Sequence, residues 1–166
     1  RSRPADCVAR HRLRALPVSR DRAGAAIGTI RLVELNGTWR AIRADDDVRR
    51  NAIGLDVDDG DWPGLEVPGH WRHHPEFADN DDPVLYRRRF TMSAPEPGRR
   101  RWVTLDGVFY QADVFLDGAY LGDPEGYFFP HSFDVTALSR IGDEHVVAIE
   151  VACPPQDPSE RDHREF

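Results

Sequence analysis

The sequence predicts an all-β fold, a jelly-roll β-sandwich with at most one short helix. Short runs of alternating apolar and polar residues recur through the second half of the chain, and Gly-rich or Asp-Gly turn signals separate them. Only one stretch carries helix-capping signals. The length of 166 residues suits one domain with a sizeable core.

The chain divides into three segments by composition. Residues 1–28 are rich in Arg and Ala and show no strand alternation, so we predict a poorly ordered lead-in there. The alternation of apolar and polar residues begins at Thr29, and we predict the sandwich domain over residues 29–153. Residues 154–166 are expected to begin a linker to a further domain.

The first half of the domain predicts a hairpin, a helix and a loop. Asn36-Gly37 stands between two alternating runs and predicts a tight turn, because both residue types tolerate positive φ. The stretch DDDVRRNAI starts with Asp N-cap candidates and ends at Gly54, which predicts the one short helix. The following WPGLEVPGHW is rich in Pro and Gly and is expected to be extended or looped.

The second half predicts strand after strand. The run VLYRRRFTM places Val84, Tyr86 and Phe90 on one face and Arg87 and Arg89 on the other. The runs RWVTL, ADVFL, AYLG and HVVAIEVAC are further short strands, and an Asp-Gly turn joins the second of these to the third.

The charge pattern excludes some partners. All 22 basic residues are Arg, and the formal net charge is −7. The first 22 residues are basic and the remainder is acidic, so we expect neither nucleic acid nor an anionic membrane as a partner. No apolar run approaches the length of a membrane span, and no secretory signal is visible near the start, which favours a cytoplasmic over a secreted location.

Two polar stretches are candidates for chemistry. HWRHHPEF holds three His and a Glu, but its Pro and Gly neighbours argue against the helix that would let them converge on zinc. We therefore expect a solvated loop, no metal site and no cofactor. EFADNDDPV supplies four carboxylates and an Asn, and three functions stay open for it: an acid/base pair, a calcium loop or polar contact with a sugar. The calcium spacing lacks the Gly and the final Glu of the known pattern.

The aromatic stretch GYFFPHSF could form a ligand platform or part of the core. Consecutive strand residues face alternate sides, so Tyr127, Phe128 and Phe129 cannot all point inward. We assign Phe133 and one of the Phe pair to the core. Tyr127 is a candidate for stacking on a sugar, with packing or a domain interface as the alternative.

Six motifs in order resemble the N-terminal sugar-binding domain of glycoside hydrolase family 2, the β-galactosidase, β-glucuronidase and β-mannosidase group. They are LNGTWRA, WPGLEVPGHW, VLYRRRF, VTLDGVFYQADVFLDGAYLG, GYFFPHSFDVT and HVVAIEV. The resemblance implies a jelly-roll sandwich. It also implies a parent enzyme that hydrolyses O-glycosyl bonds with retention, by two glutamates on a barrel domain that this chain lacks. We therefore expect no catalytic residue in the chain, and an inactive isolated domain.

The resemblance also implies partners and contact residues. The partners are a carbohydrate, at the non-reducing end of a β-glycoside, and the immunoglobulin-like and barrel domains that would follow. Loops of this domain help to shape the sugar pocket, and they correspond to residues 73–82 and 156–162. Within them we expect Asp79, Asn80 and Asp157 to contact substrate. The alternative function is a stand-alone carbohydrate-binding, lectin-like sandwich.

Overall fold

The computed structural model describes residues 33–140 and 142–153, and they form a sandwich of two antiparallel sheets, which confirms the predicted all-β class. The strands and the helix are β1 (Gly37–Arg43), α1 (Asp46–Asn51), β2 (Gly64–Val67), β3 (Val84–Thr91), β4 (Trp102–Leu105), β5 (Gln111–Leu116), β6 (Ala119–Gly122), β7 (His131–Asp134) and β8 (Glu144–Ala152). Three single 3-10 turns are η1 (Trp71–His73), η2 (Pro75–Phe77) and η3 (Leu138–Arg140). No helix in the described ranges has the length and apolar character needed to cross a membrane.

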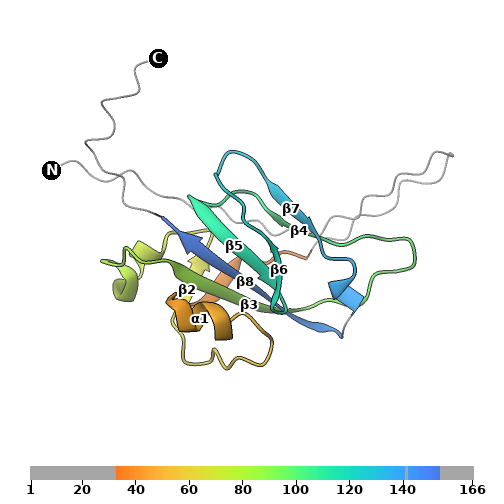
Figure 1. Cartoon of the computed structure of the whole chain (residues 1–166), viewed down its shortest axis with the longest axis horizontal. Helices are drawn as coiled ribbons and strands as arrows, with labels where there is room; N and C mark the ends of the chain where they lie inside the picture. The colour runs from red at the N-terminus through yellow and green to blue at the C-terminus, as the bar shows by residue number, and fades with distance from the viewer. Residues whose placement is uncertain (1–32, 141, 154–166) are drawn as a thin grey trace, which may run out of the picture.

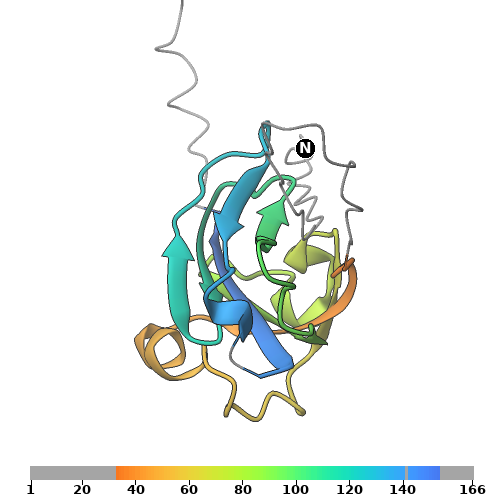
Figure 2. The ribbon, with the colours of Figure 1, turned by 90° about the vertical axis from the view of Figure 1, so that its right-hand side faces the viewer.

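The larger sheet has the strand order β2-β1-β3-β8-β5-β6, and the smaller sheet pairs β4 with β7. Figure 1 shows the small sheet on one side of the large sheet and α1 on the other. Turned by 90°, Figure 2 shows the two layers facing each other. The long strands β3 and β8 lie side by side at the centre of the large sheet.

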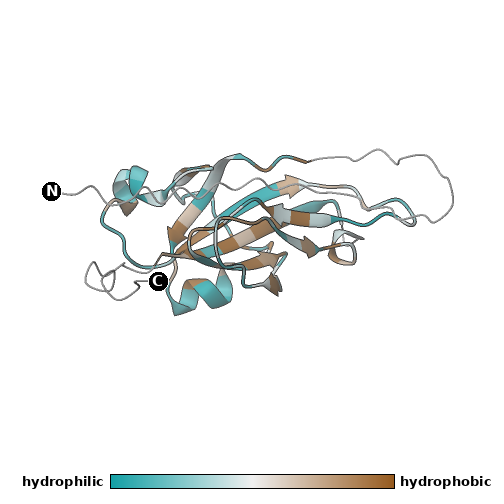
Figure 3. Ribbon diagram, turned by 90° about the horizontal axis from the view of Figure 1, so that it is seen from above, coloured by the Kyte–Doolittle hydropathy of each residue, from teal (hydrophilic) through white to brown (hydrophobic). Residues whose placement is uncertain are grey.

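The core fills the space between the two sheets. Its largest fully buried apolar side chains are Trp39, Phe77, Leu105, Leu116 and Ile149. In Figure 3 the apolar residues concentrate on the strands, whereas α1 is mostly hydrophilic. Burial of each large apolar side chain contributes about 1.5–3 kcal/mol, so this core is the main source of stability.

The predicted helix and the predicted Asp-Gly turn are both confirmed. Asp45 caps α1, because its side chain accepts the backbone N–H groups of Asp47 and Val48. Asp117 and Gly118, with φ of 51° and 84°, form the turn between β5 and β6. Positive φ at both positions matches the right-handed twist of a tight hairpin.

The predicted hairpin at Asn36-Gly37 is wrong for the described part of the chain. Residues 33–36 form no strand, and β1 instead pairs with β2 and β3. Leu35 enters the core, where its carbonyl accepts the indole N–H of Trp39 at 2.7 Å. This buried contact replaces the cross-strand pairing that the turn dipeptide suggested.

A second apolar cluster covers the outer face of the large sheet, beneath α1 and loop 53–62. Val48, Ile53, Val57 and Trp62 pack there against Leu85 and other buried residues. Arg87 points to this face, as the alternation predicted. The central strands are therefore buried on both faces.

Candidate functional site

Strand register brings three loops to one end of the sandwich. Val84 at the start of β3 pairs with Val151 near the end of β8, and Gln111 at the start of β5 pairs with Ala152. The first residues of β3 and β5 thus flank the end of β8, about 10 Å apart, because adjacent strands are spaced by 4.7–4.9 Å. We call this region, formed by loops 68–83, 106–110 and 123–130, the loop end.

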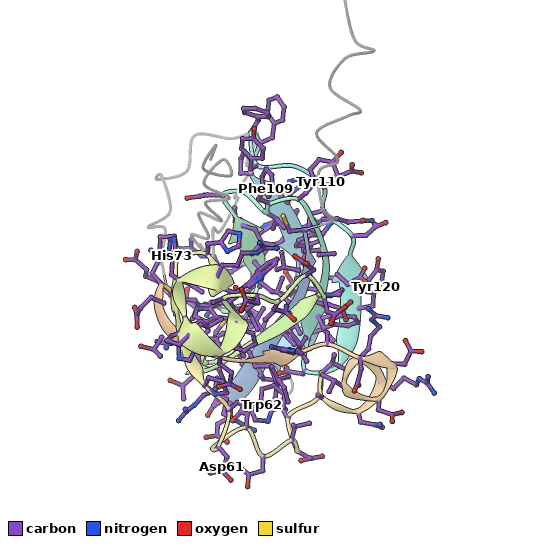
Figure 4. All side chains as sticks on the ribbon, turned by 90° about the vertical axis from the view of Figure 1, so that its left-hand side faces the viewer. Asp61, Trp62, His73, Phe109, Tyr110 and Tyr120 are labelled. Atoms are coloured by element: carbon purple, nitrogen blue, oxygen red, sulfur yellow. The ribbon has the colours of Figure 1, made fainter. Side chains whose placement is uncertain are left out.

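Figure 4 looks toward this end of the molecule. Phe109 and Tyr110 lie along its upper margin and His73 along an adjacent one, whereas Asp61 and Trp62 lie along the opposite margin. The loop end therefore presents a polar side, from loop 68–83, and an aromatic side, from the other two loops.

Loop 68–83 is held by two buried aromatic residues, Trp71 and Phe77. Two histidines begin its 3-10 turns. The Nδ1 atom of His70 accepts the backbone N–H of Arg72 at 3.0 Å, and that of His74 accepts the N–H of Glu76 at 3.3 Å. The predicted solvated loop is thus an anchored one, in which these ring nitrogens cap turns.

The same loop holds two of the predicted sugar contacts, and the structure separates them. Asp79 is exposed. Asn80 is only 2% exposed. Its side-chain Nδ2 donates to the backbone carbonyl of Asp82 at 2.6 Å, and its backbone carbonyl accepts the indole N–H of Trp71 at 3.2 Å. Asp79 is therefore presented to solvent, whereas Asn80 organises the loop from inside. Asp157, the third predicted contact, lies outside the described residues.

The aromatic side corrects one assignment. Phe128 and Phe129 are 76% and 75% exposed, so the prediction that one of them belongs to the core is wrong. Residues 123–130 form a loop between β6 and β7, and the two-residue alternation of a strand does not apply to them. Phe133, in β7, packs against the core as predicted. Tyr127 is 45% exposed, which leaves its ring accessible.

Sequence reasoning missed Phe109 and Tyr110 as members of this surface. The ring of Phe109 lies 5.1 Å from that of Tyr127 between centroids, and Tyr110 is 42% exposed. The only signal in the sequence was an aromatic pair next to Gly107 in a predicted turn, and that pattern does not say which way the rings face.

One pair of neighbouring carboxylates, Asp113 and Glu150, lies outside the loop end. The two are cross-strand neighbours on β5 and β8. Burial, followed by the charge of Glu150, raises the pKa of Asp113. Arg49 of α1 donates to both carboxylate oxygens of Glu150 at 2.8 Å from Nε, so the pair is partly neutralised and joins α1 to the sheet. This arrangement is structural.

Within the described ranges, no group of three His, Cys, Asp or Glu residues is placed to hold a metal ion. The loop end offers exposed carboxylates and aromatic rings, which suit polar contact with a ligand and apolar stacking or docking.

Two antiparallel sheets of this topology, with three loops gathered at one end, define a β-sandwich of the galactose-binding-domain-like class. The chain belongs to the family described as glycosyl hydrolase 2 galactose-binding domain-like, which matches residues 76–165, more than half of the sequence. The resemblance read from the motifs is therefore confirmed at the level of the family.

Three proteins illustrate the relationship. A β-glucuronidase from Formosa agariphila is 24% identical over 128 residues, covering 70% of this chain and 13% of that enzyme. A β-galactosidase from Bifidobacterium adolescentis is 30% identical over 139 residues, covering 65% of this chain and 13% of that enzyme. Among solved structures, a β-glucuronidase from Faecalibacterium prausnitzii superposes with a TM-score of 0.62 at 22% identity, over 72% of this chain and 20% of that one.

The chain thus corresponds to a single domain of these enzymes. It spans 13% of the length of both curated relatives, and their names place β-glucuronidase and β-galactosidase activities in the same family. The structural similarity supports the fold alone.

Proposed function

We propose that the chain is the N-terminal sugar-binding and scaffolding domain of a family 2 β-glycosidase, and that bond cleavage takes place elsewhere in the parent polypeptide. The observation that carries the proposal is the family match together with the coverage, because the chain corresponds to only 13% of the length of related β-glycosidases. In this proposal, residues 29–153 are the sandwich domain, and residues 154–166 begin the linker to the next domain.

The electrostatics of the described residues agree with a non-catalytic role. A retaining glycosidase needs two carboxyl groups that face each other across the sugar, one of them free to act as nucleophile. Asp113 and Glu150 are close, but Glu150 is only 5% exposed and is bound by Arg49 on the outer face of the sheet. That geometry leaves no space for a substrate between them.

The role of the domain in the proposed enzyme is to supply polar contacts at the rim of the sugar pocket. Asp79 is the residue of loop 68–83 best suited to it, because its carboxylate is exposed and can accept sugar hydroxyls. Asn80 acts indirectly, by fixing the loop that carries Asp79. Asp157 is proposed as a second direct contact.

Kinetics of the full-length polypeptide test this role. Asp79→Ala is expected to raise the KM for an aryl β-glycoside substrate by several-fold, because a rim contact contributes to substrate binding. Asp61→Ala is the matched control, an exposed Asp at the opposite margin of the molecule, and it should leave the KM unchanged. Equal kinetic constants for the wild type and Asp79→Ala would contradict the role of Asp79.

A stand-alone carbohydrate-binding function is the second candidate, and the exposed ring of Tyr127 favours it. Titration of the isolated chain with galactose, glucuronic acid and mannose distinguishes the two. Binding that Tyr127→Ala abolishes and Tyr120→Ala preserves would support the stand-alone function. Our proposal expects no saturable binding by the isolated chain.

A further inference from the structure

Five aromatic side chains gather on loops 106–110 and 123–130, and all of them except the partly buried Phe109 are exposed. We call this group the aromatic surface: Phe109, Tyr110, Tyr127, Phe128 and Phe129. Consecutive ring centroids along it lie 6.2, 5.1 and 4.1 Å apart, from Tyr110 through Phe109 and Tyr127 to Phe128. Large apolar groups gathered in this way on a soluble domain usually mark an interaction site.

The backbone beneath these rings is fixed by hydrogen bonds between the two loops. The N–H of Gly126 donates to the carbonyl of Tyr110 at 2.8 Å, and the N–H of Val108 donates to the carbonyl of Gly126 at 3.3 Å. The loops also approach so closely that a Cβ on Gly107 would lie 2.8 Å from the carbonyl oxygen of Tyr127. The backbone that carries the rings is therefore ordered before any partner binds, which lowers the entropic cost of binding.

The composition of the surface favours a protein partner over a sugar. Phe128 and Phe129, its two most exposed members, have no polar atom in their side chains. A sugar site needs polar groups that fix the hydroxyls, whereas the centre of a protein interface is aromatic and its rim is polar. Asp123 and Glu125, both exposed on the same loop, provide such a rim.

The path of the chain identifies the partner. The N–H of Tyr110 donates to the carbonyl of Ala152 at 3.2 Å, so the last strand ends directly beside the aromatic surface. Related enzymes are several times longer than this chain, as its 13% coverage of them shows. The described end of β8 thus lies next to an apolar surface of its own domain.

We infer that the aromatic surface is the docking site for the part of the parent polypeptide that follows residue 166, and that Phe128 and Phe129 insert into an apolar recess of that part. This inference rests on the proposed function, since it requires a longer enzyme. It adds to that function the surface through which the domain is fixed against the remainder.

Hydroxyl-radical footprinting with mass spectrometry tests the inference, because it reports the exposure of individual aromatic side chains. The isolated chain and the full-length polypeptide from the same gene are labelled under identical conditions. We expect the labelling rates of Phe128 and Phe129 to fall about fivefold or more in the full-length protein. Tyr120, which is 56% exposed on the β6 strand, is the internal control and should keep its rate.

Three outcomes would overturn the inference. Unchanged labelling of Phe128 and Phe129 in the full-length protein would show that nothing covers them. Protection of the isolated chain that increases with its own concentration would assign the surface to a second copy. Protection of the isolated chain by galactose or glucuronic acid would assign it to sugar.

The test separates this inference from the proposed function. A full-length protein that hydrolyses aryl β-glycosides but leaves both Phe residues labelled would uphold the function and overturn the docking site. A full-length protein that lacks glycosidase activity but protects Phe128 and Phe129 would overturn the proposed function and uphold the docking site, which would then belong to a parent protein of another kind.

Discussion

Two loops of this protein carry aromatic side chains and place them in opposite ways. Loop 53–62 turns Trp62 inward, where its ring lies 5.4 Å from the guanidinium carbon of Arg87. Arg87 is fully buried, pairs with Asp59 at 3.0 Å and donates to the carbonyl of Gly54 at 2.7 Å. Loop 123–130 instead leaves Phe128 and its neighbours in solvent.

The difference shows which of the two loops has its aromatic side chains covered by the described residues. Loop 53–62 finds its apolar and charged contacts on the outer face of the large sheet. The loops of the aromatic surface are joined by backbone hydrogen bonds, but Phe128 and Phe129 have no apolar cover from the described residues. The predictions below test each side of this comparison, beginning with the largest expected effect.

Removal of the buried charge under loop 53–62 should have the largest effect. Arg87→Met is expected to lower the free energy of unfolding by about 3–5 kcal/mol, because Asp59 then loses its buried partner. Denaturant titration measures the change. Arg89→Met is the matched control: Arg89 also contacts Asp59, but its side chain is 46% exposed, so we expect a loss below about 1 kcal/mol. Equal losses would contradict the account of this loop.

A substitution under the aromatic surface tests whether its backbone is rigid. Gly107→Ala is expected to cost about 1–3 kcal/mol of unfolding free energy, because the added methyl group meets the backbone of Tyr127. Gly54→Ala, where a methyl group meets no atom within 4 Å, is the control and should change stability by less than about 0.5 kcal/mol. A neutral Gly107→Ala would show that the two loops separate easily.

The acidic pair on the outer face predicts a pH effect. Because the pKa of Asp113 is raised by burial and then by Glu150, the folded protein holds a proton there at a pH at which the unfolded chain has lost it. Ionised Asp113 thus disfavours folding as the pH rises through that interval, and the penalty is absent below the unfolded pKa.

We therefore expect Asp113→Asn to stabilise the protein at pH 7 and to lose that advantage in acid. Urea titrations between pH 3 and pH 7 measure the effect. Asp61→Asn, an exposed carboxylate that is not among the groups acting on Asp113, is the control. An advantage for Asp113→Asn that grows in acid would contradict the sign of the shift.

The smallest effect is expected at the aromatic surface itself. Phe128→Ser and Phe129→Ser should each change the free energy of unfolding of the isolated chain by less than about 0.5 kcal/mol, because both rings are already in solvent. Thermal and denaturant unfolding measure it. A loss of 2 kcal/mol or more, about the cost of emptying a core position, would mean that these rings stabilise the domain internally.

Most of the fold was predictable because local patterns and tertiary structure agree. Alternation of apolar and polar residues located strands such as β3 and β8. The Asp117-Gly118 dipeptide located the tight turn between β5 and β6. The Asn36-Gly37 hairpin failed because Leu35 is drawn into the core, a long-range contact that a dipeptide signal does not contain.

The site was less predictable, since exposure depends on the surrounding structure. Asp79 and Asn80 are adjacent and similar in size and polarity, yet one faces solvent and the other is buried beside Trp71. The prediction that one of Phe128 and Phe129 lies in the core failed for the same reason: their position in a loop, and not their hydrophobicity, decides their exposure.

Turnover by the isolated chain is the most direct test of the central claim, that this domain positions substrate but breaks no bond. The assay uses aryl β-galactoside and aryl β-glucuronide substrates at high protein concentration. We predict release of the aryl group at the uncatalysed rate. Measurable hydrolysis that Glu150→Gln or Asp113→Asn abolishes would contradict the claim and place the chemistry on this sandwich.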